Sequence, residues 1–320
     1  MRALICEKLG GPEQLRIVEL PIPQPKMGEI LVRVRFAALN FFDSLIIQGR
    51  YQQKPEMPFS PSAEFAGEVV AGEGWEAGTR VAGFIGWGAA REYILVRAEQ
   101  LVIIPDGVED EAAAGLAVTY GTAIHGLQSR AQLKPGESLA ILGAAGGAGQ
   151  AAIEIGKILG AKIVACASSE EKLADAQRLG ADVLIDYSQV DLKEALKAHT
   201  QGAGVDVVYD PVGGDLAEPA LRATAWGGRY LVVGFASGDI PQIPANLVLV
   251  KGSSLVGVHW SAHAKRDAAG FQAEFRQLLG LVQAKKIAPQ IHASFALEDW
   301  QGAYDVIVQR QARGKILLKL

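Results

Sequence analysis

Residues Glu137 to Ser169 read ESLAILGAAGGAGQAAIEIGKILGAKIVACASS, and this stretch decides the fold. The short apolar run Ser138 to Leu142 predicts a strand. Apolar residues then recur at helical spacing from Ala151 to Leu159, and Lys162 to Ala167 predicts a second buried strand. Strand, glycine-rich turn, helix and strand in this order form the first βαβ unit of a nucleotide-binding sheet.

The glycine turn of this unit departs from the usual fingerprint. The G-x-G-x-x-G pattern aligns with Ala144-Ala145-Gly146-Gly147-Ala148-Gly149, so its first glycine is an alanine. Glycines in such turns also serve tight backbone packing without a ligand. The spacing of the flanking elements nevertheless favours dinucleotide binding, with the pyrophosphate against the backbone of Gly146, Gly147 and Ala148 at the positive end of the helix.

The composition indicates a globular protein that acts on a small molecule. The chain has 320 residues, 49% of them hydrophobic, which is enough for two domains. The formal net charge is -4 and no Lys/Arg run stands out, so nucleic acid and anionic membranes are disfavoured as partners. No leader or membrane-length apolar run is apparent, which predicts a cytoplasmic location. The two cysteines, Cys6 and Cys166, are predicted to be small buried residues.

Two composition patterns follow each other along the chain. Up to about residue 117 it is β-rich, with candidate strands at 2–6, 14–19, 29–39, 67–72, 79–84, 91–96 and 101–104. Helical and strand patterns then alternate: helices at 111–117, 121–130, 170–179, 192–200 and 215–225, and strands at 182–185, 205–209, 229–233 and 254–258. This alternation predicts a parallel, doubly wound sheet. Helices at 268–285 and 297–309 and a strand at 315–320 close the chain, and Trp260-Ser261 is predicted to be a loop.

The closing segment does not form another βαβ unit, and its last strand is free to return to the N-terminal region. We therefore predict an α/β protein with two domains. A discontinuous, β-rich catalytic domain comprises residues 1–117 and 265–320, and an inserted Rossmann dinucleotide-binding domain comprises residues 118–264.

Several motifs together resemble one family over nearly the whole length. They are Asn40-Phe41-Phe42-Asp43, Gly49-Arg50-Tyr51, Ala63-Glu64-Phe65-Ala66-Gly67, Val118-Thr119, Ala144 to Gly149, Asp210-Pro211-Val212-Gly213-Gly214, Val233 to Gly238 and Gly314-Lys315. The chain resembles the zinc-independent quinone oxidoreductases of the medium-chain dehydrogenase/reductase superfamily, the zeta-crystallin type. The resemblance implies a GroES-like first domain, a cleft between domains, hydride transfer from a nicotinamide cofactor and a homodimer.

The ligands of a catalytic zinc ion are missing at the corresponding positions. Alcohol dehydrogenases of this superfamily place a Cys where this chain has Asn40 or Phe41, and a His-Glu pair where it has Ala63-Glu64. Catalytic zinc needs three protein ligands, which Glu64 alone cannot supply. His259 and His263 stand four residues apart and are interpreted as incidental. The sequence therefore predicts no metal, and reduction of an activated acceptor rather than oxidation of a zinc-bound alcohol.

The end of the second strand predicts NADPH as the cofactor. An NAD-binding strand usually ends in an acid that holds the ribose 2′-hydroxyl, whereas this strand ends in Ala167-Ser168-Ser169. A 2′-phosphate meets no repulsion there, and Lys172 in the next turn can neutralise it. The alternative is that Ser168 caps the helix in a capping box with Glu171 and that Lys172 is solvated.

The other predicted cofactor contacts come mainly from the resemblance. It adds Tyr187 and Arg310 near the phosphate, for which an edge tyrosine and a surface arginine are the alternatives, and Thr119 with the Phe235-Ala236-Ser237 loop near the nicotinamide and ribose. Phe42 is predicted to lie beside the cofactor or in an apolar wall for a flat acceptor, and the alternative is a core residue.

Three side chains are candidates for the chemistry. The amide of Asn40 can donate to a quinone or enone oxygen as negative charge develops, or can be a turn-forming residue. Tyr51 is predicted to donate a hydrogen bond or a proton to the substrate, or to be a rim aromatic. Asp43 is predicted to orient neighbouring backbone or the nicotinamide side.

The predicted function is NADPH-dependent reduction of quinones. The nearest alternative is reduction of α,β-unsaturated carbonyls or enoyl thioesters, for which Arg50, Lys54 and Arg91 offer a thin set of cations. A second alternative is an NADPH-binding sensor or structural protein without turnover. For the predicted homodimer, Ser254 to Val258 is the candidate strand for pairing across a two-fold axis.

Overall fold

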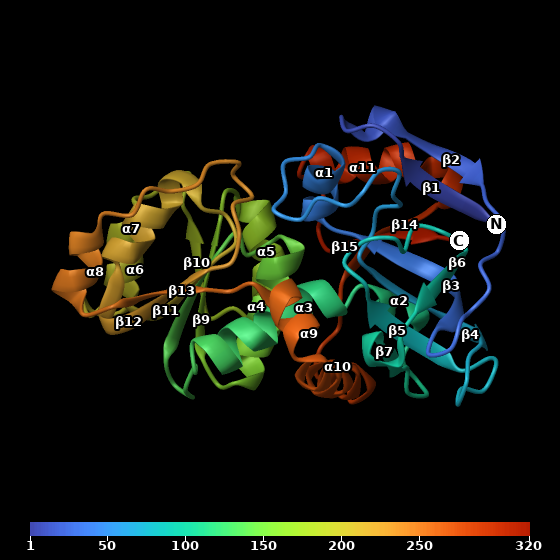
Figure 1. Ribbon diagram of the computed structural model, residues 1–320. Coiled ribbons are helices and arrows are strands. Elements are labelled where there is room, and N and C mark those ends of the chain that lie inside the picture. The colour runs from blue at the N-terminus through green and yellow to red at the C-terminus, as the bar shows by residue number, and fades with distance from the viewer. The chain divides into compact units, whose positions relative to one another are not determined.

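The computed structural model describes residues 1–320 and divides into two compact units. One unit consists of Met1–Gly121 and Ser261–Leu320, and the other of Thr122–Trp260. Figure 1 shows a β-rich unit that contains both chain ends and a second unit built on a parallel sheet. The predicted α/β class is confirmed. No helix of the chain is both long enough and apolar enough to cross a membrane.

The unit Thr122–Trp260 is a doubly wound, all-parallel sheet of six strands in the order β10-β9-β8-β11-β12-β13. The strands are β8 (Ser138–Leu142), β9 (Lys162–Ala167), β10 (Val183–Asp186), β11 (Val205–Asp210), β12 (Thr224–Val232) and β13 (Ser254–Gly257). Helices α4 (Gly147–Ile158), α5 (Glu170–Arg178), α6 (Leu192–His199), α7 (Ala217–Arg222) and α8 (Ala245–Lys251) connect them. The strand order reverses on the two sides of β8, and ligands of such sheets bind at this switch point.

One predicted helix of this unit is shorter than expected. The segment 215–225 contains only a 3₁₀ turn, Gly214–Leu216, and helix α7, while Thr224 already belongs to β12 and pairs with Val205. Helix propensity is a weak preference, and the backbone pairing of β12 with β11 overrides it here.

The other unit is built around a seven-stranded sheet. Its order is β14-β15-β3-β4-β5-β7, β6 also pairs with β3, and β1 and β2 form a separate hairpin. The strands are β1 (Arg2–Cys6), β2 (Leu15–Glu19), β3 (Ile30–Leu39), β4 (Glu64–Ala71), β5 (Arg80–Phe84), β6 (Tyr93–Val96), β7 (Leu101–Ile103), β14 (Ile291–Ala296) and β15 (Lys315–Lys319). All pairs in this sheet are antiparallel except β14 with β15.

The remaining helices flank this sheet or run across the division between the units. They are α1 (Phe41–Ile47), α2 (Asp110–Ala114), α3 (Ala117–Ile124) with a π-helical turn at His125–Arg130, α9 (Trp260–Arg266), α10 (Ala268–Gln283) and α11 (Trp300–Val308). The prediction of a loop at Trp260-Ser261 is wrong, because α9 begins there. Trp260 and Ala264, one helical turn apart, are both buried, and this packing explains a helix that the local sequence does not signal.

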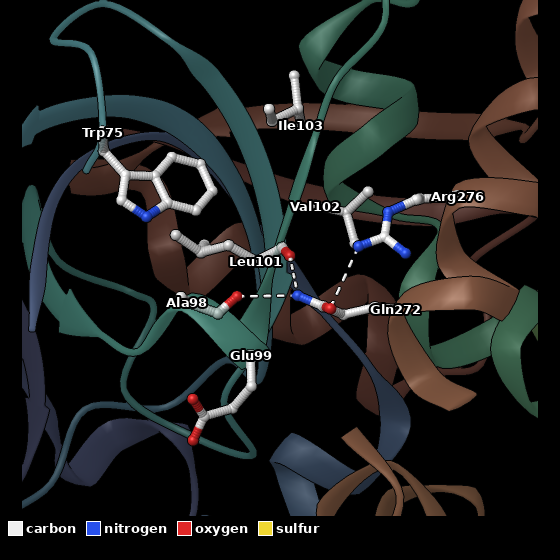
Figure 2. Close-up of a pocket in the computed structure, with 8 residues that line it drawn as sticks. All are labelled: Trp75, Ala98, Glu99, Leu101, Val102, Ile103, Gln272 and Arg276. Atoms are coloured by element: carbon white, nitrogen blue, oxygen red, sulfur yellow. Dashed lines mark hydrogen bonds between the residues drawn. The ribbon is translucent and has the colours of Figure 1, made fainter. Parts of the chain in front are cut away.

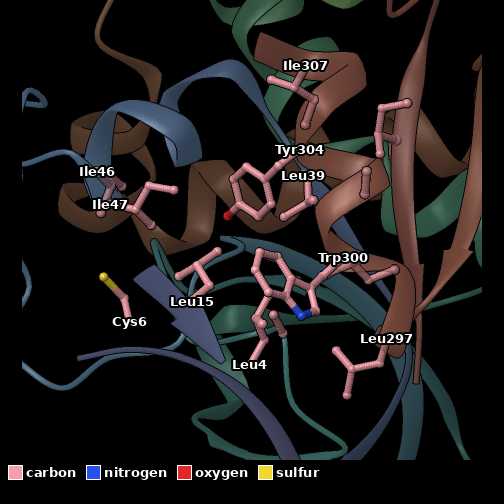
Figure 3. Close-up of a cluster of buried hydrophobic side chains, with 14 of the residues drawn as sticks. Leu4, Cys6, Leu15, Leu39, Ile46, Ile47, Leu297, Trp300, Tyr304 and Ile307 are labelled. Carbon is pink, nitrogen blue, oxygen red and sulfur yellow. The ribbon is translucent and has the colours of Figure 1, made fainter. Parts of the chain in front are cut away.

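A compact apolar cluster anchors the strands and helices that carry the candidate site. Trp300, Ala303, Tyr304 and Ile307 form the buried stripe of α11, at the spacing i, i+3, i+4, i+7. Figure 3 shows Trp300 and Tyr304 packed toward Leu4, Leu15 and Leu39 from the strands and toward α1. Each large side chain buried in this way contributes about 1.5–3 kcal/mol.

The closing strand joins the sheet of the β-rich unit beside β3. Strand β15 pairs antiparallel with β3, with Ile316 opposite Leu39 and Lys319 opposite Phe36. Gly314 leads into it with a φ of 122°, and a Cβ there would lie 2.3 Å from the carbonyl oxygen of Gln290. A glycine is therefore required directly before Lys315.

Candidate functional site

A buried ion pair and one amide form the polar centre of the β-rich unit. Lys315 begins β15, Asn40 directly follows β3 and Glu64 begins β4, so three neighbouring strands bring them together. Lys315 Nζ donates to Glu64 Oε1 at 2.6 Å and to Asn40 Oδ1, and Asn40 Nδ2 donates to Glu64 Oε1 at 3.0 Å. The side chains of Lys315 and Glu64 are only 5% and 0% exposed.

The second carboxylate oxygen of Glu64 holds the start of a helix. It accepts the backbone N–H of Val118, in the first turn of α3, at 2.8 Å. A carboxylate is favourable at this end of a helix, because the unpaired N–H groups and the helix dipole carry partial positive charge. Glu64 therefore joins the amide of Asn40, the ammonium of Lys315 and the N-terminus of α3.

The glycine at the end of α2 makes room for the lysine stem, and Gly314 admits the backbone turn before it. Gly115 lies against the stem of Lys315, and a Cβ at that position would lie 2.9 Å from Lys315 Cγ. The aliphatic part of the side chain thus passes over backbone at the end of α2 and carries its charge to a place where water is excluded.

Asp43 orders the backbone next to Asn40. Its carboxylate accepts the N–H of Asn40 at 2.7 Å and that of Ser62 at 3.0 Å, and its side chain is fully buried. Asn40 is the N-cap of α1, but its side chain is engaged by Lys315 and Glu64. Burial raises the pKa of Asp43 to about 7, against the opposing effect of the two N–H donors and of Lys315.

Tyr51 lies half-buried beside this cluster. Its ring stacks on that of Phe42, with centroids 5.3 Å apart and an interplanar angle of 25°. Burial, followed by the negative charge of Asp43, raises the pKa of the phenol, which therefore stays protonated at neutral pH. Its O–H can act as a hydrogen-bond donor.

The residues at the positions of the zinc ligands do not fit a zinc ion. They are an amide at Asn40, a buried methyl group at Ala63 and a carboxylate at Glu64. Both Asn40 Oδ1 and Glu64 Oε1 already face the ammonium of Lys315, so the chain supplies its own cation there. Neither thiolate nor imidazole is among these groups.

The turn between β8 and α4 forms a cradle of backbone in the other unit. Gly146 is the N-cap of α4 and leaves its first N–H groups without a side-chain cap. Gly149 fits only without a side chain, because a Cβ would lie 2.4 Å from the carbonyl oxygen of Gly143. The turn thus packs tightly behind Gly149 and presents Gly146, Gly147 and Ala148 at the positive helix end, which fits a pyrophosphate.

The residues after β9 do not form the capping box that was the alternative to phosphate binding. Ser169, and not Ser168, is the N-cap of α5, and it accepts the N–H of Lys172 at 3.4 Å. A capping box of Ser168 with Glu171 is therefore wrong. The hydroxyl of Ser168 instead lies 3.1 Å from Lys172 Nζ, so a neutral donor and a cation lie together at the carboxyl end of β9.

The loop after β12 and Tyr187 lie at the same edge of the sheet. Tyr187 follows β10, and its N–H donates to the carbonyl oxygen of Ala167 at 3.1 Å, directly beside Ser168. Ala236 and Ser237 donate their N–H groups to Pro211 and Val212, which follow β11. These carboxyl strand ends together form the edge at which a doubly wound sheet binds nucleotides.

The remaining predicted cofactor contacts belong to the β-rich unit. Thr119 is buried in α3 and its Oγ1 donates to Gly115 O at 3.3 Å, and Phe42 lies in α1 stacked on Tyr51. Arg310 is exposed after α11 in a left-handed conformation, with a φ of 57°. The roles predicted for these three residues stay predictions.

Sequence reasoning missed the pairing of Lys315 with Glu64. The two residues are 251 positions apart and carry no local pattern. The available signal was a lysine directly after a glycine and directly before the apolar run Ile316 to Leu318. Such a lysine is rarely buried without a partner, so an acid had to be expected nearby.

A shallow hollow of about 490 Å³ in the β-rich unit holds none of the predicted residues. Figure 2 shows its apolar wall of Trp75, Leu101, Val102 and Ile103 and the amide of Gln272, which donates to the carbonyl oxygens of Ala98 and Leu101 at 2.9 Å.

Comparisons with known proteins agree with the two units. Residues 26–106 match the alcohol dehydrogenase GroES-like domain, and residues 147–284 match the family described as zinc-binding dehydrogenase. A quinone oxidoreductase-like protein 2 homolog of Nematostella vectensis is 39% identical, over 99% of this chain and 88% of that protein.

Two solved structures share the fold over the whole chain. The quinone oxidoreductase of Pseudomonas syringae superimposes with a TM-score of 0.93 at 31% identity, covering 100% of this chain and 99% of that one. The quinone oxidoreductase of Escherichia coli, solved in complex with NADPH, gives a TM-score of 0.92 at 28% identity, covering 100% of both chains.

Proposed function

Because the chain belongs to the quinone oxidoreductases of the medium-chain dehydrogenase/reductase superfamily, the zeta-crystallin type, we propose that it reduces quinones with NADPH and without a metal. The observation that carries the metal-free part is the ammonium of Lys315 at the carboxylate of Glu64 and the amide oxygen of Asn40. We propose that residues 1–117 and 265–320 form the catalytic domain and that residues 118–264 form the cofactor-binding domain. We also propose a cytoplasmic location.

The cofactor would bind at the carboxyl ends of the strands of the parallel sheet. The backbone of Gly146, Gly147 and Ala148 would hold its pyrophosphate, and Ser168 with Lys172 its 2′-phosphate. Further contacts would come from Phe42, Thr119, Tyr187, Phe235, Ala236, Ser237 and Arg310. When bound, NADPH supplies the hydride, so the protein has only to position the acceptor and stabilise charge.

The proposed role of Asn40 is to donate a hydrogen bond to the acceptor oxygen as it becomes negative. The amide nitrogen donates to Glu64 at 3.0 Å and, in a longer and weaker hydrogen bond, to the carbonyl oxygen of Ala38 at 3.5 Å. On binding of the acceptor, the N–H in the longer bond would turn to the acceptor oxygen. Asp43 holds the backbone of Asn40 by accepting its N–H.

The proposed role of Tyr51 is to donate its O–H to the acceptor or to a water that delivers the proton. Its stacking on Phe42 fixes the ring plane, and its raised pKa keeps the proton on the phenol.

The unpaired edge of the parallel sheet supports the homodimer. Strand β13 ends the sheet, its Leu255 is 41% exposed, and nearby α8 exposes Leu249 and Val250 by 78% and 63%. An apolar edge strand of this kind is a template for pairing with a second copy, and a two-fold axis closes such an interface.

One observation favours the second candidate, reduction of α,β-unsaturated carbonyls or enoyl thioesters. Arg91 Nε is buried without a hydrogen-bond partner, and burial lowers the pKa of the guanidinium. An unpaired, partly desolvated arginine suits the phosphates of a coenzyme A thioester.

Oxidation of NADPH and of NADH should be measured with benzoquinones, 2-alkenals and crotonyl thioester. We expect the highest kcat/KM with NADPH and a benzoquinone. A preference for the thioester, lost in Arg91→Ala, would favour the second candidate. Tight NADPH binding with no oxidation by any acceptor would leave a sensor or structural role.

A further inference from the structure

The amide of Asn40 has one orientation that the two ions around it permit. Lys315 carries three N–H donors and no acceptor, whereas the carboxylate of Glu64 only accepts. Asn40 Oδ1 faces the ammonium and Nδ2 faces the carboxylate. A flipped amide would turn NH₂ toward Lys315 and oxygen toward Glu64, and both contacts would be repulsive.

We propose that the buried Lys315–Glu64 ion pair orients the Asn40 amide so that an N–H, and not the carbonyl oxygen, is offered to the acceptor, which makes Lys315 and Glu64 positioning residues for hydride transfer. This inference rests on the proposed function. The ion pair decides which end of the amide donates, and Asn40 makes the contact with the acceptor.

Holding the strands together does not require the ion pair. Strand β15 is already paired with β3 by its backbone ladder, from Ile316 opposite Leu39 to Lys319 opposite Phe36, and β3 is paired with β4. Ile316 and Leu318 also lie in the apolar cluster with Trp300 and Tyr304. Burying two charges costs desolvation that their attraction often fails to recover, so such pairs are weak devices for stability.

The surroundings are shaped for this arrangement. Only glycine fits at position 314, where a Cβ would meet the backbone of Gln290. Only glycine fits at position 115, where a Cβ would meet the stem of Lys315. Glu64 gains a further N–H from Val118, so the carboxylate is held on both oxygens and cannot rotate away from Asn40. Each member of the cluster has its partners, which gives the amide one fixed orientation.

The chain allows a direct observation of this amide, because Asn40 and Asn246 are its only asparagines. Asn246 is exposed on α8 and serves as the internal reference. In protein labelled with ¹⁵N-asparagine we expect two side-chain NH₂ pairs. The two side-chain amide protons of Asn40 should have well-separated chemical shifts, because one of them contacts the carboxylate. They should exchange with solvent at least about tenfold more slowly than those of Asn246.

Three variants separate orientation from stability. Glu64→Gln/Lys315→Met removes both charges of the pair together, and a glutamine accepts either orientation of Asn40. Lys315→Arg keeps a cation that only donates. Arg80→Met/Asp110→Asn is the matched control, since that pair joins at 2.6 Å in the same unit and its acid is also buried.

In the neutral double variant we expect the Asn40 signals to broaden or double and kcat with a benzoquinone to fall about 100-fold, the loss typical of an oxyanion donor. The KM for NADPH should change less than about threefold, because the cofactor cradle lies in other residues. Lys315→Arg should retain at least about a tenth of the wild-type kcat. The Arg80→Met/Asp110→Asn control should retain the wild-type kcat even if its melting temperature is lower.

Unchanged Asn40 signals in the neutral double variant would overturn the inference, and so would altered signals with an unchanged kcat. Equal losses of kcat in the control variant would also overturn it, since they would assign the effect to stability. If the wild-type protein reduces no acceptor, the proposed function fails, while the asparagine spectra still decide whether the ion pair orients the amide.

Discussion

The buried carboxylate of Asp43 accepts the backbone N–H of Asn40 at 2.7 Å, so one acid fixes the position of the residue that would meet the acceptor. Burial raises the pKa of this acid to about 7. Because the folded protein then binds a proton that the unfolded chain releases near pH 4, this group contributes stability at low pH that is lost as the pH rises toward and through 7.

We therefore expect the free energy of unfolding to contain a component from Asp43 that falls by up to about 4 kcal/mol between pH 4 and pH 8. Asp43→Asn removes the titration and should give a flatter profile. Urea unfolding of both proteins across this range measures the difference, in which the other ionisable groups cancel. Parallel profiles would show that Asp43 titrates as it does in the unfolded chain.

Lys172→Ala should raise the KM for NADPH about tenfold, equivalent to about 1.4 kcal/mol, and leave the KM for NADH nearly unchanged. The reason is the approach of Lys172 Nζ to Ser168 at the strand end where the 2′-phosphate would lie. Lys162→Ala is the control, since Lys162 is exposed at the opposite end of the same strand. Equal effects on both cofactors would remove Lys172 from the phosphate site.

Tyr51→Phe keeps the ring stacked on Phe42 and removes only the hydroxyl. We expect kcat with a benzoquinone to fall by about 10²-fold with an unchanged dissociation constant for NADPH. The pH profile of the wild-type protein should show no step from Tyr51 below pH 10, because its pKa is raised. Tyr93→Phe, in β6, is the matched control. A variant as active as the wild type would make Tyr51 a rim aromatic.

Leu255→Glu should convert the protein from dimer to monomer, because a charge on the edge strand β13 opposes pairing with a second copy. Light scattering coupled to gel filtration measures the mass. Val308→Glu is the control, since Val308 is 47% exposed on α11 of the other unit, close to the 41% of Leu255. A monomeric wild-type protein, or dimers of both variants, would contradict the proposed interface.

Local patterns in the sequence were sufficient for the parallel-sheet unit. The apolar run of β8, the helical spacing of α4 and the glycines between them act within a few residues, and the predicted βαβ unit is present. The exceptions are residues where distant pairing overrode local preference. Thr224 joins β12 through its pairing with Val205, and α9 forms where a loop was predicted.

The candidate site divides in the same way. The sequence by itself determined the glycine cradle, the strand end without an acid and the lack of zinc ligands at Asn40 and Ala63, because each depends on residue identity at one place in the chain. Only the tertiary structure decided that Ser169 caps α5 and that Lys315 faces Glu64 and Asn40. The physical reason is sequence separation: Lys315 lies 275 residues from Asn40, and only the pairing of β15 with β3 brings a buried charge to its partners.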